Sequence, residues 1–478
     1  MNSESISTKA VKSTIWSALN KFSVTALKFF VNLLLARLLS PNDFGIIGMI
    51  TIFIAISYTF VDGGFGSALI QKKNPTEIDY STIFIWNVTI GSLFYIIIYF
   101  SSNYIAQFYR MPILSTILKV LGITVILGGI ANILSNRLQK KLRFKGLAIT
   151  DIASYIISAV IAVIMAFKNF GVWSLVFMSI IQPFIRIILM TIITKWIPTI
   201  QFSYSAFKEL FSFSGYLFIS NLLENTFKNS QGLVIGKMFS ATQMGYYSQA
   251  EKLNNITSYI LPQVITSVMY PIFSKYQDDR EKLTSIILTN LKIISFIIFP
   301  LLTILILIAP DVIVYLYGTK WINSIPYFRI LCVGGYFLCL SDILYYAIAA
   351  CGKSKLLLMS SFYKWGMLAL LMALGLKFGM DGLVWSISIS FLNIFFTNCV
   401  LLYRTLDLSI SSILKSVYIT AFLNISIFSI LIIVISYLNI HWTLIISIYI
   451  ITYIISSYWL NTETVIKSLE LIKKIRQK

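Results

Sequence analysis

The chain has 478 residues, of which 58% are hydrophobic and only 12% are charged. Soluble domains are about 45–50% apolar and about 25% charged, so this composition excludes an ordinary soluble protein. The formal net charge of +20 would suggest nucleic acid as the partner of a soluble chain. Here Lys and Arg fall mainly in short loops between apolar runs, which indicates a membrane protein without a nucleic-acid partner.

Fourteen apolar segments are each long enough to cross a membrane, which takes about 20 residues of helix. They are 14–39, 44–62, 81–101, 113–134, 148–167, 172–194, 212–236, 242–273, 283–308, 326–350, 356–376, 382–403, 413–438 and 442–460. The first is too long for the apolar core of a signal peptide, so we expect a spanning helix there. The seventh and eighth are the weakest because both carry several polar residues.

The distribution of basic residues sets the orientation. With the N-terminus inside, 23 of the 38 Lys and Arg residues fall in inner segments and six in outer loops. Because basic residues concentrate on the cytoplasmic side, this bias predicts that both termini are cytoplasmic.

Two stretches that lie 200 residues apart carry the same pattern in the same register. Leu35–Ser40 leads to Gly45, and Ile235–Ser240 leads to Gly245. Lys28 and Lys228 also match within the apolar segments that these stretches close. The first and seventh spans run in the same direction in this topology, so the pattern predicts a parallel repeat of two six-helix lobes.

We therefore expect an all-α integral membrane protein with about 14 transmembrane helices. The predicted parts are an N-terminal lobe (1–195), an inner-surface linker (196–211), a C-terminal lobe (212–404), helices 13 and 14 (405–460) and a basic cytoplasmic tail (461–478).

Charged residues inside the spans are mostly basic. The basic residues are Lys21, Lys28, Lys119, Arg186, Lys228, Lys252, Lys292, Arg329 and Lys364, and the acids are Asp151, Glu224, Glu251 and Asp342. Asp151 and Arg329 are near predicted ends and could reach the interface. Such residues are costly in lipid and normally face a protein or water interior.

Helical spacing gathers part of these charges into stripes. Lys21 and Lys28 share one face of the first helix, and a second stripe and its neighbour hold Asn221, Glu224, Asn225, Lys228 and Lys252. These seven residues are our candidate substrate-binding residues, lining a basic cavity that suits a phosphate or diphosphate. The alternative is that Glu224 and Lys228, four residues apart, merely neutralise each other.

Residue patterns for catalysis, metals and cofactors are missing from the sequence. His441 is the only histidine, and the four cysteines have no metal-site spacing. We predict no catalytic residue, no metal and no cofactor. A membrane enzyme such as a polymerase or acyltransferase would need a larger outer loop or a catalytic histidine.

Several motifs in order resemble the bacterial polysaccharide flippases, the Wzx-like branch (WzxC/TuaB-like group) of the multidrug/oligosaccharidyl-lipid/polysaccharide exporter superfamily. The first is the run Phe60–Asn74 after the second span. The others are Leu138–Phe144, Ile235–Lys237, Gly245–Ala250, Val268–Asp279, Trp321 and Gly352–Lys353.

This resemblance implies a central cavity between two lobes, alternating access, and export of an undecaprenyl-diphosphate-linked oligosaccharide for O-antigen, capsule or exopolysaccharide synthesis. It also implies the bacterial inner membrane, with membrane lipids, a polysaccharide polymerase and other biosynthesis proteins as partners. Family members often carry an acid where Gln231 stands, so coupling through that acid is in doubt, and Glu224 could substitute. A multidrug exporter of the same superfamily is the alternative function.

Overall fold

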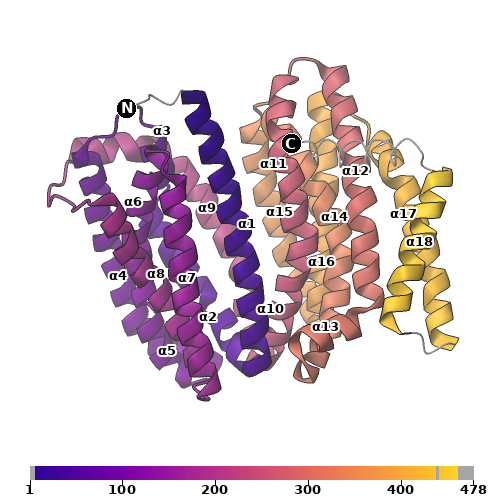
Figure 1. Ribbon diagram of the computed structural model, residues 1–478, viewed down its shortest axis with the longest axis horizontal. Helices are drawn as coiled ribbons and strands as arrows, with labels where there is room; N and C mark the ends of the chain where they lie inside the picture. Colours follow the sequence, from indigo (N-terminus) through magenta and orange to yellow (C-terminus); the bar gives the residue numbers. More distant parts are fainter. Residues whose placement is uncertain (1–5, 438–440, 461–478) are drawn as a thin grey trace. The chain divides into compact units, whose positions relative to one another are not determined.

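The computed structural model describes residues 6–437 and 441–460 (Figure 1). Within these ranges all regular structure is helical, so the predicted all-α class is confirmed. The predicted basic tail, 461–478, lies outside the described residues. The chain divides into two compact units, Met1–Gly245 and Tyr246–Lys478.

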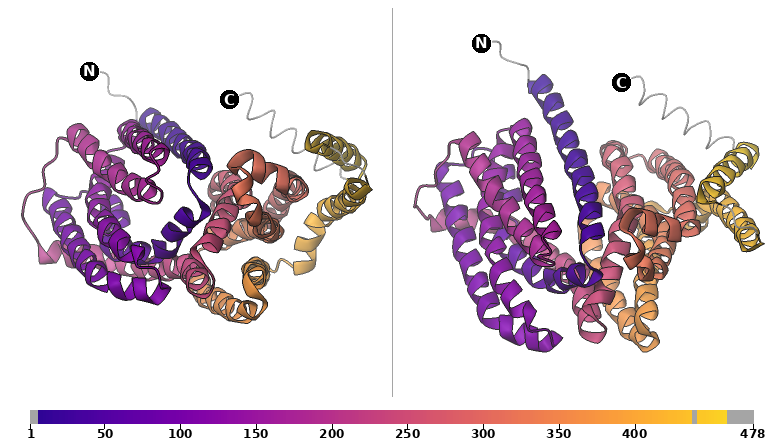
Figure 2. Two further views of the ribbon diagram at one scale, coloured as in Figure 1. Left: turned by 90° about the horizontal axis from the view of Figure 1, so that it is seen from below. Right: turned by 60° about the horizontal axis from the view of Figure 1, so that its bottom comes forward.

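The first unit holds the helices from α1 to α9. They are α1 (Ile6–Leu38), α2 (Pro41–Asp62), α3 (Phe65–Gln71), α4 (Glu77–Tyr109), α5 (Ile113–Leu121), α6 (Ile123–Lys140), α7 (Phe144–Phe167), α8 (Trp173–Thr194) and α9 (Tyr204–Met238). Within this unit α1 lies alongside α7, and α6 packs against both α4 and α8 (Figures 1 and 2).

The second unit begins within α10 (Ala241–Asn255). It continues through the π-helical turn η1 (Ile256–Ile260), α11 (Leu261–Lys275), α12 (Arg280–Leu307), α13 (Ala309–Tyr317), the 3-10 turn η2 (Thr319–Ser324), α14 (Ile325–Ala350), α15 (Ser354–Gly375), the 3-10 turn η3 (Leu376–Phe378), α16 (Gly379–Leu406), α17 (Ile410–Tyr437) and α18 (Trp442–Leu460). In this unit α14 and α15 both pack against α16, and α12 packs against α14 and α17.

The serines of the repeated pattern begin two helices. Asp43 N donates to Ser40 Oγ at 3.3 Å, and Ser40 N donates to Asp43 Oδ2 at 2.9 Å, which closes a capping box at the start of α2. At the start of α10, Gln243 N donates to Ser240 Oγ at 3.2 Å. Each serine therefore satisfies a backbone donor that the first helical turn leaves unpaired.

The glycines of the same pattern lie where α2 and the start of α10 cross. A Cβ atom on Gly45 would stand 1.6 Å from Ala241 O, and one on Gly245 would stand 1.8 Å from Pro41 O. Both separations are far inside van der Waals contact, so only glycine fits at these two positions. The matched pattern thus combines a capping serine with a crossing glycine five residues later.

Helix α9 packs against α2, α3 and α4, so its contacts place it in the first unit. At Gly232 the backbones are close, because a Cβ there would stand 2.4 Å from Gly48 O of α2. The sequence assigns 212–236 to the C-terminal lobe. The predicted division into lobes follows the sequence repeat, and it stays a prediction.

Among the described residues, eleven helical segments are long and apolar enough to cross a membrane. The number is twelve if the bent pair Ala241–Thr266 and Met269–Lys275 forms one span. One of the eleven, Leu356–Leu406, covers α16 and all but the first two residues of α15. Helix α9 is outside the set because its polar residues lower its hydropathy. All fourteen predicted segments are helical where described, but the number of crossings stays a prediction.

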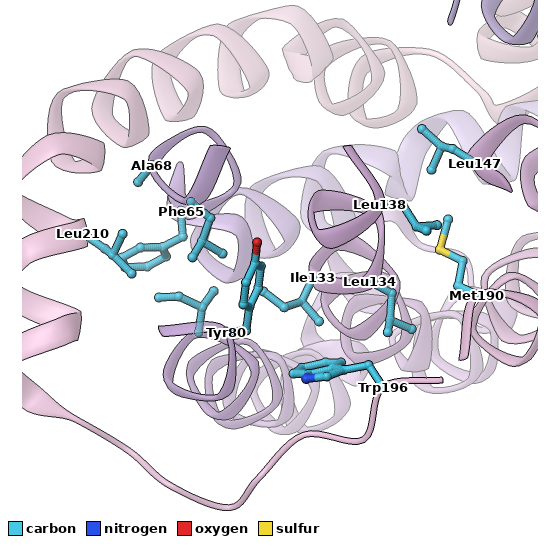
Figure 3. Packing of buried hydrophobic residues seen from close by; sticks show 12 residues of the cluster. Phe65, Ala68, Tyr80, Ile133, Leu134, Leu138, Leu147, Met190, Trp196 and Leu210 are labelled. Carbon is cyan, nitrogen blue, oxygen red and sulfur yellow. The ribbon is translucent and has the colours of Figure 1, made fainter. Parts of the chain in front are cut away.

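A buried hydrophobic cluster joins several helices of the first unit at one end. Side chains from α3, α4, α6 and the segment after α8 converge there, as Figure 3 shows for Phe65, Tyr80, Leu134 and Trp196. Phe65 is fully buried, and Tyr80 is 4% exposed. This packing holds the ends of the helices that carry the charged side chains described next.

Candidate functional site

The seven predicted substrate-binding residues lie on three helices. Lys21 and Lys28 are exposed on α1; Asn221, Glu224 and Lys228 are exposed on α9, where Asn225 is half-buried; Lys252 is exposed on α10 in the second unit. Six of the seven side chains are therefore exposed on their own helices. Whether they line one cavity stays a prediction.

Asn225 fastens α9 to α2. Its Nδ2 atom donates to Thr59 Oγ1 at 3.0 Å. The Thr59 hydroxyl in turn donates to Ala55 O at 2.9 Å, and Thr59 is 5% exposed. The hydrogen-bonding capacity of Asn225 is thus used partly for helix packing.

A second polar group, which the sequence did not assign to a site, joins four helices of the first unit. Asp151 Oδ1 of α7 accepts from Arg186 Nε of α8 at 2.6 Å, and Asp151 Oδ2 accepts from Asn20 Nδ2 of α1 at 3.0 Å. Arg186 Nη2 also donates to Ser135 Oγ of α6 at 3.0 Å. The Asp151 carboxylate is thus paired with other helices, and its position relative to the membrane interface stays a prediction.

Asp62 forms a related polar contact at a break in the helix. Its carboxylate accepts from Asn132 Nδ2 of α6 and, at 3.3 Å, from Gly64 N. Gly63 and Gly64 have φ values of 53° and 73°, a left-handed conformation that glycine adopts without steric cost. The two glycines end α2 and start α3, and so expose a backbone donor that the Asp62 carboxylate can bind.

Three of these polar residues lie at a similar distance from a helix end. Asn132 precedes the end of α6 and Arg186 the end of α8, while Asp151 follows the start of α7, each by roughly two helical turns. We call Asn20, Asp62, Asn132, Ser135, Asp151 and Arg186 the polar layer. Mutual pairing lets these groups occupy apolar helices at lower cost.

Closer to the helix ends, Arg137 is held by both charge and stacking. Its two Nη atoms donate to Glu77 Oε2 and Oε1, each at 2.6 Å, and its guanidinium carbon lies 5.0 Å from the ring centroids of both Tyr80 and Trp196. Trp196 Nε1 also donates to Glu77 Oε2 at 2.8 Å. Arginine suits this site because its planar fork can bind a carboxylate and stack on rings at once.

Lys72 extends this set of contacts to α9. Its Nζ atom lies 3.1 Å from Asp79 Oδ1 and 2.9 Å from Glu209 Oε2. Burial alone would lower the pKa of Lys72, but its hydrogen bonds with Glu209 and Asp79 raise that pKa above the ordinary value. Lys72 is therefore cationic at neutral pH and ties the loop after α3 to α4 and α9.

The second unit contains a buried lysine, Lys364 on α15. Lys364 is 8% exposed, and its Nζ atom donates to Asn398 Oδ1 of α16 at 2.6 Å. Asn398 Nδ2 in turn donates to Ser341 Oγ of α14 at 2.9 Å. Three helices of this unit thus share one hydrogen-bonded chain.

The sequence identified most of these charged groups but did not show which of them pair. Arg186, Asp151 and Lys364 were recognised as charges in apolar segments, but nothing in the spacing along one helix shows a partner on another. For Asp62, the signal was the Asp-Gly-Gly order, since two glycines after an acid favour a helix break with a carboxylate cap.

Residues 34–326 match the family described as polysaccharide biosynthesis protein. The chain is 26% identical over 333 residues to the teichuronic acid biosynthesis protein TuaB of Bacillus subtilis, covering 69% of each chain. It is 22% identical over 311 residues to the succinoglycan biosynthesis transport protein ExoT of Rhizobium meliloti, covering 65% of this chain and 63% of ExoT.

The fold is similar to that of the lipid II flippase MurJ in an inward closed conformation. The TM-score is 0.76 at 17% sequence identity, and the match covers 94% of this chain and 100% of the MurJ chain. At this identity, the similarity concerns the fold.

Proposed function

The chain belongs to the polysaccharide biosynthesis protein family, and we propose that it moves lipid-linked oligosaccharide units across the bacterial inner membrane. The cargo is an undecaprenyl-diphosphate-linked repeat unit for O-antigen, capsule or exopolysaccharide synthesis. Transport proceeds by alternating access between two lobes, with both termini in the cytoplasm. The observation that carries this proposal is the family match across residues 34–326.

The nature of the relatives supports transport rather than an enzymatic reaction. ExoT is named as a transport protein of polysaccharide biosynthesis, and MurJ, which shares the fold, is named as a lipid flippase. Several helices of this chain are apolar enough to span a membrane and yet carry charged side chains. A transporter uses such residues to line or support a polar path.

The cargo diphosphate binds, in this proposal, to the lysines on the exposed faces of α1, α9 and α10. Lys21, Lys28 and Lys228 provide positive charge in the first unit, and Lys252 provides it in the second. Lysine and arginine bind phosphate oxygens through charge-assisted hydrogen bonds. The exposure of all four side chains supports the proposal, because a buried lysine could not reach a ligand.

The deciding experiment for the cargo is deletion of the gene followed by analysis of lipid-linked repeat units. We expect these units to accumulate on the inner leaflet and polymer at the cell surface to fall. Restoring the gene should reverse both changes. If lipid-linked units do not accumulate, the flippase proposal fails.

The lysine site needs a separate experiment, with normal protein level as a condition. Lys28 and Lys228 are replaced singly by Ala and by Arg, and Lys168→Ala, an exposed lysine after α7, is the matched control. We expect the Ala variants to lose export and the Arg variants to retain more of it. Unchanged export in all four variants would reject the lysine site while leaving the flippase proposal standing.

A multidrug exporter remains the rival function because it shares the superfamily that the sequence resembles. The surplus of basic residues in the apolar segments disfavours it, since like charges repel a cationic drug. Cells expressing the protein should therefore show no added efflux of cationic dyes. Clear dye efflux with no effect on polysaccharide would favour the rival.

A further inference from the structure

A cavity of about 510 Å³ lies in the second unit between α15 and α16. These helices pack side by side and run in opposite directions, with the short turn η3 between them. Leu356, Met359, Phe396 and Val400 give the cavity a mostly apolar lining. Met359 is 60% exposed and Val400 is 40% exposed, so the cavity is an open groove rather than a sealed void.

The groove has a charged end and an uncharged end. Arg404, in the last turn of α16, lies at one end, and Tyr363 and Asn393 lie at the other, where the Tyr363 hydroxyl donates to Asn393 Oδ1 at 3.3 Å. From Asn393 to Arg404 the helix rises roughly 16 Å. That length is about half of the 30 Å hydrocarbon core of a bilayer, which is the depth of one leaflet.

The cationic end is open to an anion. Arg404 is exposed, and no ion pair involving it occurs within residues 6–437 and 441–460. Asp407, the acid that follows it, is occupied by Arg280, whose Nη1 atom lies 2.9 Å from Asp407 Oδ2. Lys353, just before α15, is also exposed at this end of the helix pair. Arginine binds a phosphate with two parallel hydrogen bonds.

We propose that the groove between α15 and α16 binds one anionic phospholipid, with an acyl chain along Met359 and Val400 and the phosphate at Arg404. The apolar lining matches the chain, the length matches one leaflet, and the unpaired arginine lies where a head group would be. In the predicted topology this leaflet is the cytoplasmic one. The proposal concerns a resident membrane lipid and is independent of the transported cargo.

The test measures lipid binding to the purified full-length protein by native mass spectrometry. Dioleoyl phosphatidylglycerol and dioleoyl phosphatidylcholine are titrated separately, so that the acyl chains are identical and only the head-group charge differs. We expect phosphatidylglycerol to bind about fivefold more tightly, the effect of roughly one basic residue at a membrane surface.

Three variants locate the site. Arg404→Gln should abolish the preference for phosphatidylglycerol, and Val400→Trp, which fills the groove, should weaken binding of both lipids. Lys377→Gln removes an exposed cation at the opposite end of α15 and should bind as the wild type does. Thermal unfolding of each variant checks that the fold is retained.

Two results would overturn the proposal. The first is a preference for phosphatidylglycerol that survives Arg404→Gln. The second is one-for-one displacement of phosphatidylglycerol by undecaprenyl diphosphate, which would make the groove a site for the cargo carrier. The lipid titrations use purified protein and do not depend on transport, so their outcome does not decide the flippase proposal. Polysaccharide export is measured separately on the same variants.

Discussion

Arg137 and Glu77 meet in a two-pronged ion pair, with both nitrogen–oxygen distances at 2.6 Å. The Arg137 side chain is 9% exposed, whereas that of Glu77 is 59% exposed. The arginine is therefore mostly removed from water, and its charge depends on this single carboxylate together with two aromatic rings. The pair connects the end of α6 to the start of α4.

The variant Arg137→Lys tests this pair. A lysine keeps the charge but loses the fork that binds both carboxylate oxygens and the flat face that stacks on Tyr80 and Trp196. We expect the free energy of unfolding to fall by about 1–3 kcal/mol. Arg143→Lys, at an exposed arginine just before α7, is the control and should change little. Equal thermal unfolding of the two variants in detergent would contradict the role given to Arg137.

The Asp151–Arg186 pair should behave as one unit. Replacing either residue alone, as in Asp151→Leu or Arg186→Met, leaves the other charge uncompensated within the bundle, and we expect a loss of about 3–5 kcal/mol. The double variant should lose much less than the sum of the two. Thermal unfolding of the four proteins gives the coupling free energy. Additive losses would show that the two side chains do not stabilise each other.

The crossing of α2 and α10 should not tolerate a single methyl group. Gly45→Ala and Gly245→Ala each place a Cβ against a backbone carbonyl, so we expect destabilisation of at least about 1–3 kcal/mol. Gly366→Ala, in α15, is the control because a Cβ there meets nothing within 4 Å. That change should stabilise the helix by about 0.5–1 kcal/mol. Unfolding temperature measures all three, and a neutral Gly45→Ala would argue against the close crossing.

Lys364 and Asn398 offer a test of a buried charge held by neutral groups. Asn398→Ala leaves the Lys364 ammonium without its acceptor, and we expect a loss of about 1–3 kcal/mol in the free energy of unfolding. Lys364→Met removes the charge and fills similar space, so it should be close to neutral or stabilising. In the Lys364→Met background, Asn398→Ala should cost less. The same cost in both backgrounds would show that the hydrogen bond is unimportant.

Helix positions were predictable because each apolar run is longer than a soluble helix needs and is bounded by polar turns. The sequence ends the second span at Asp62, where α2 ends, but it does not predict the short helix α3 that follows Gly63 and Gly64. A glycine pair interrupts a helix when other contacts stabilise the left-handed conformation. Here the Asp62 carboxylate accepts a hydrogen bond from Gly64 N, and Asn132 also binds this carboxylate from another helix.

For the candidate site, the sequence predicts which residues share a face of one helix but not which residues on other helices they contact. Helical spacing can place Lys21 and Lys28 on one face of α1, because the geometry of one helix depends on its own sequence. The partner of Asp151 is 35 residues away on the next helix, and which pairs meet depends on how the helices pack. The same limit applies to Asn225, whose contact with Thr59 was not visible in its own stripe.

The glycine crossing has a consequence for how the two matched stretches interact. Pro41 lies against Gly245, and Gly45 lies against Ala241. Ala241 and Gly245 are the residues that match Pro41 and Gly45 200 positions along the chain. The two contacts are therefore the same contact with the two stretches exchanged. This exchange is the contact pattern of an isologous interface, in which two copies of one surface bind each other. In a homodimer a mutation would alter both sides of such an interface at once. Here both sides belong to one chain, so either half of the symmetric contact can be changed while the other half stays native.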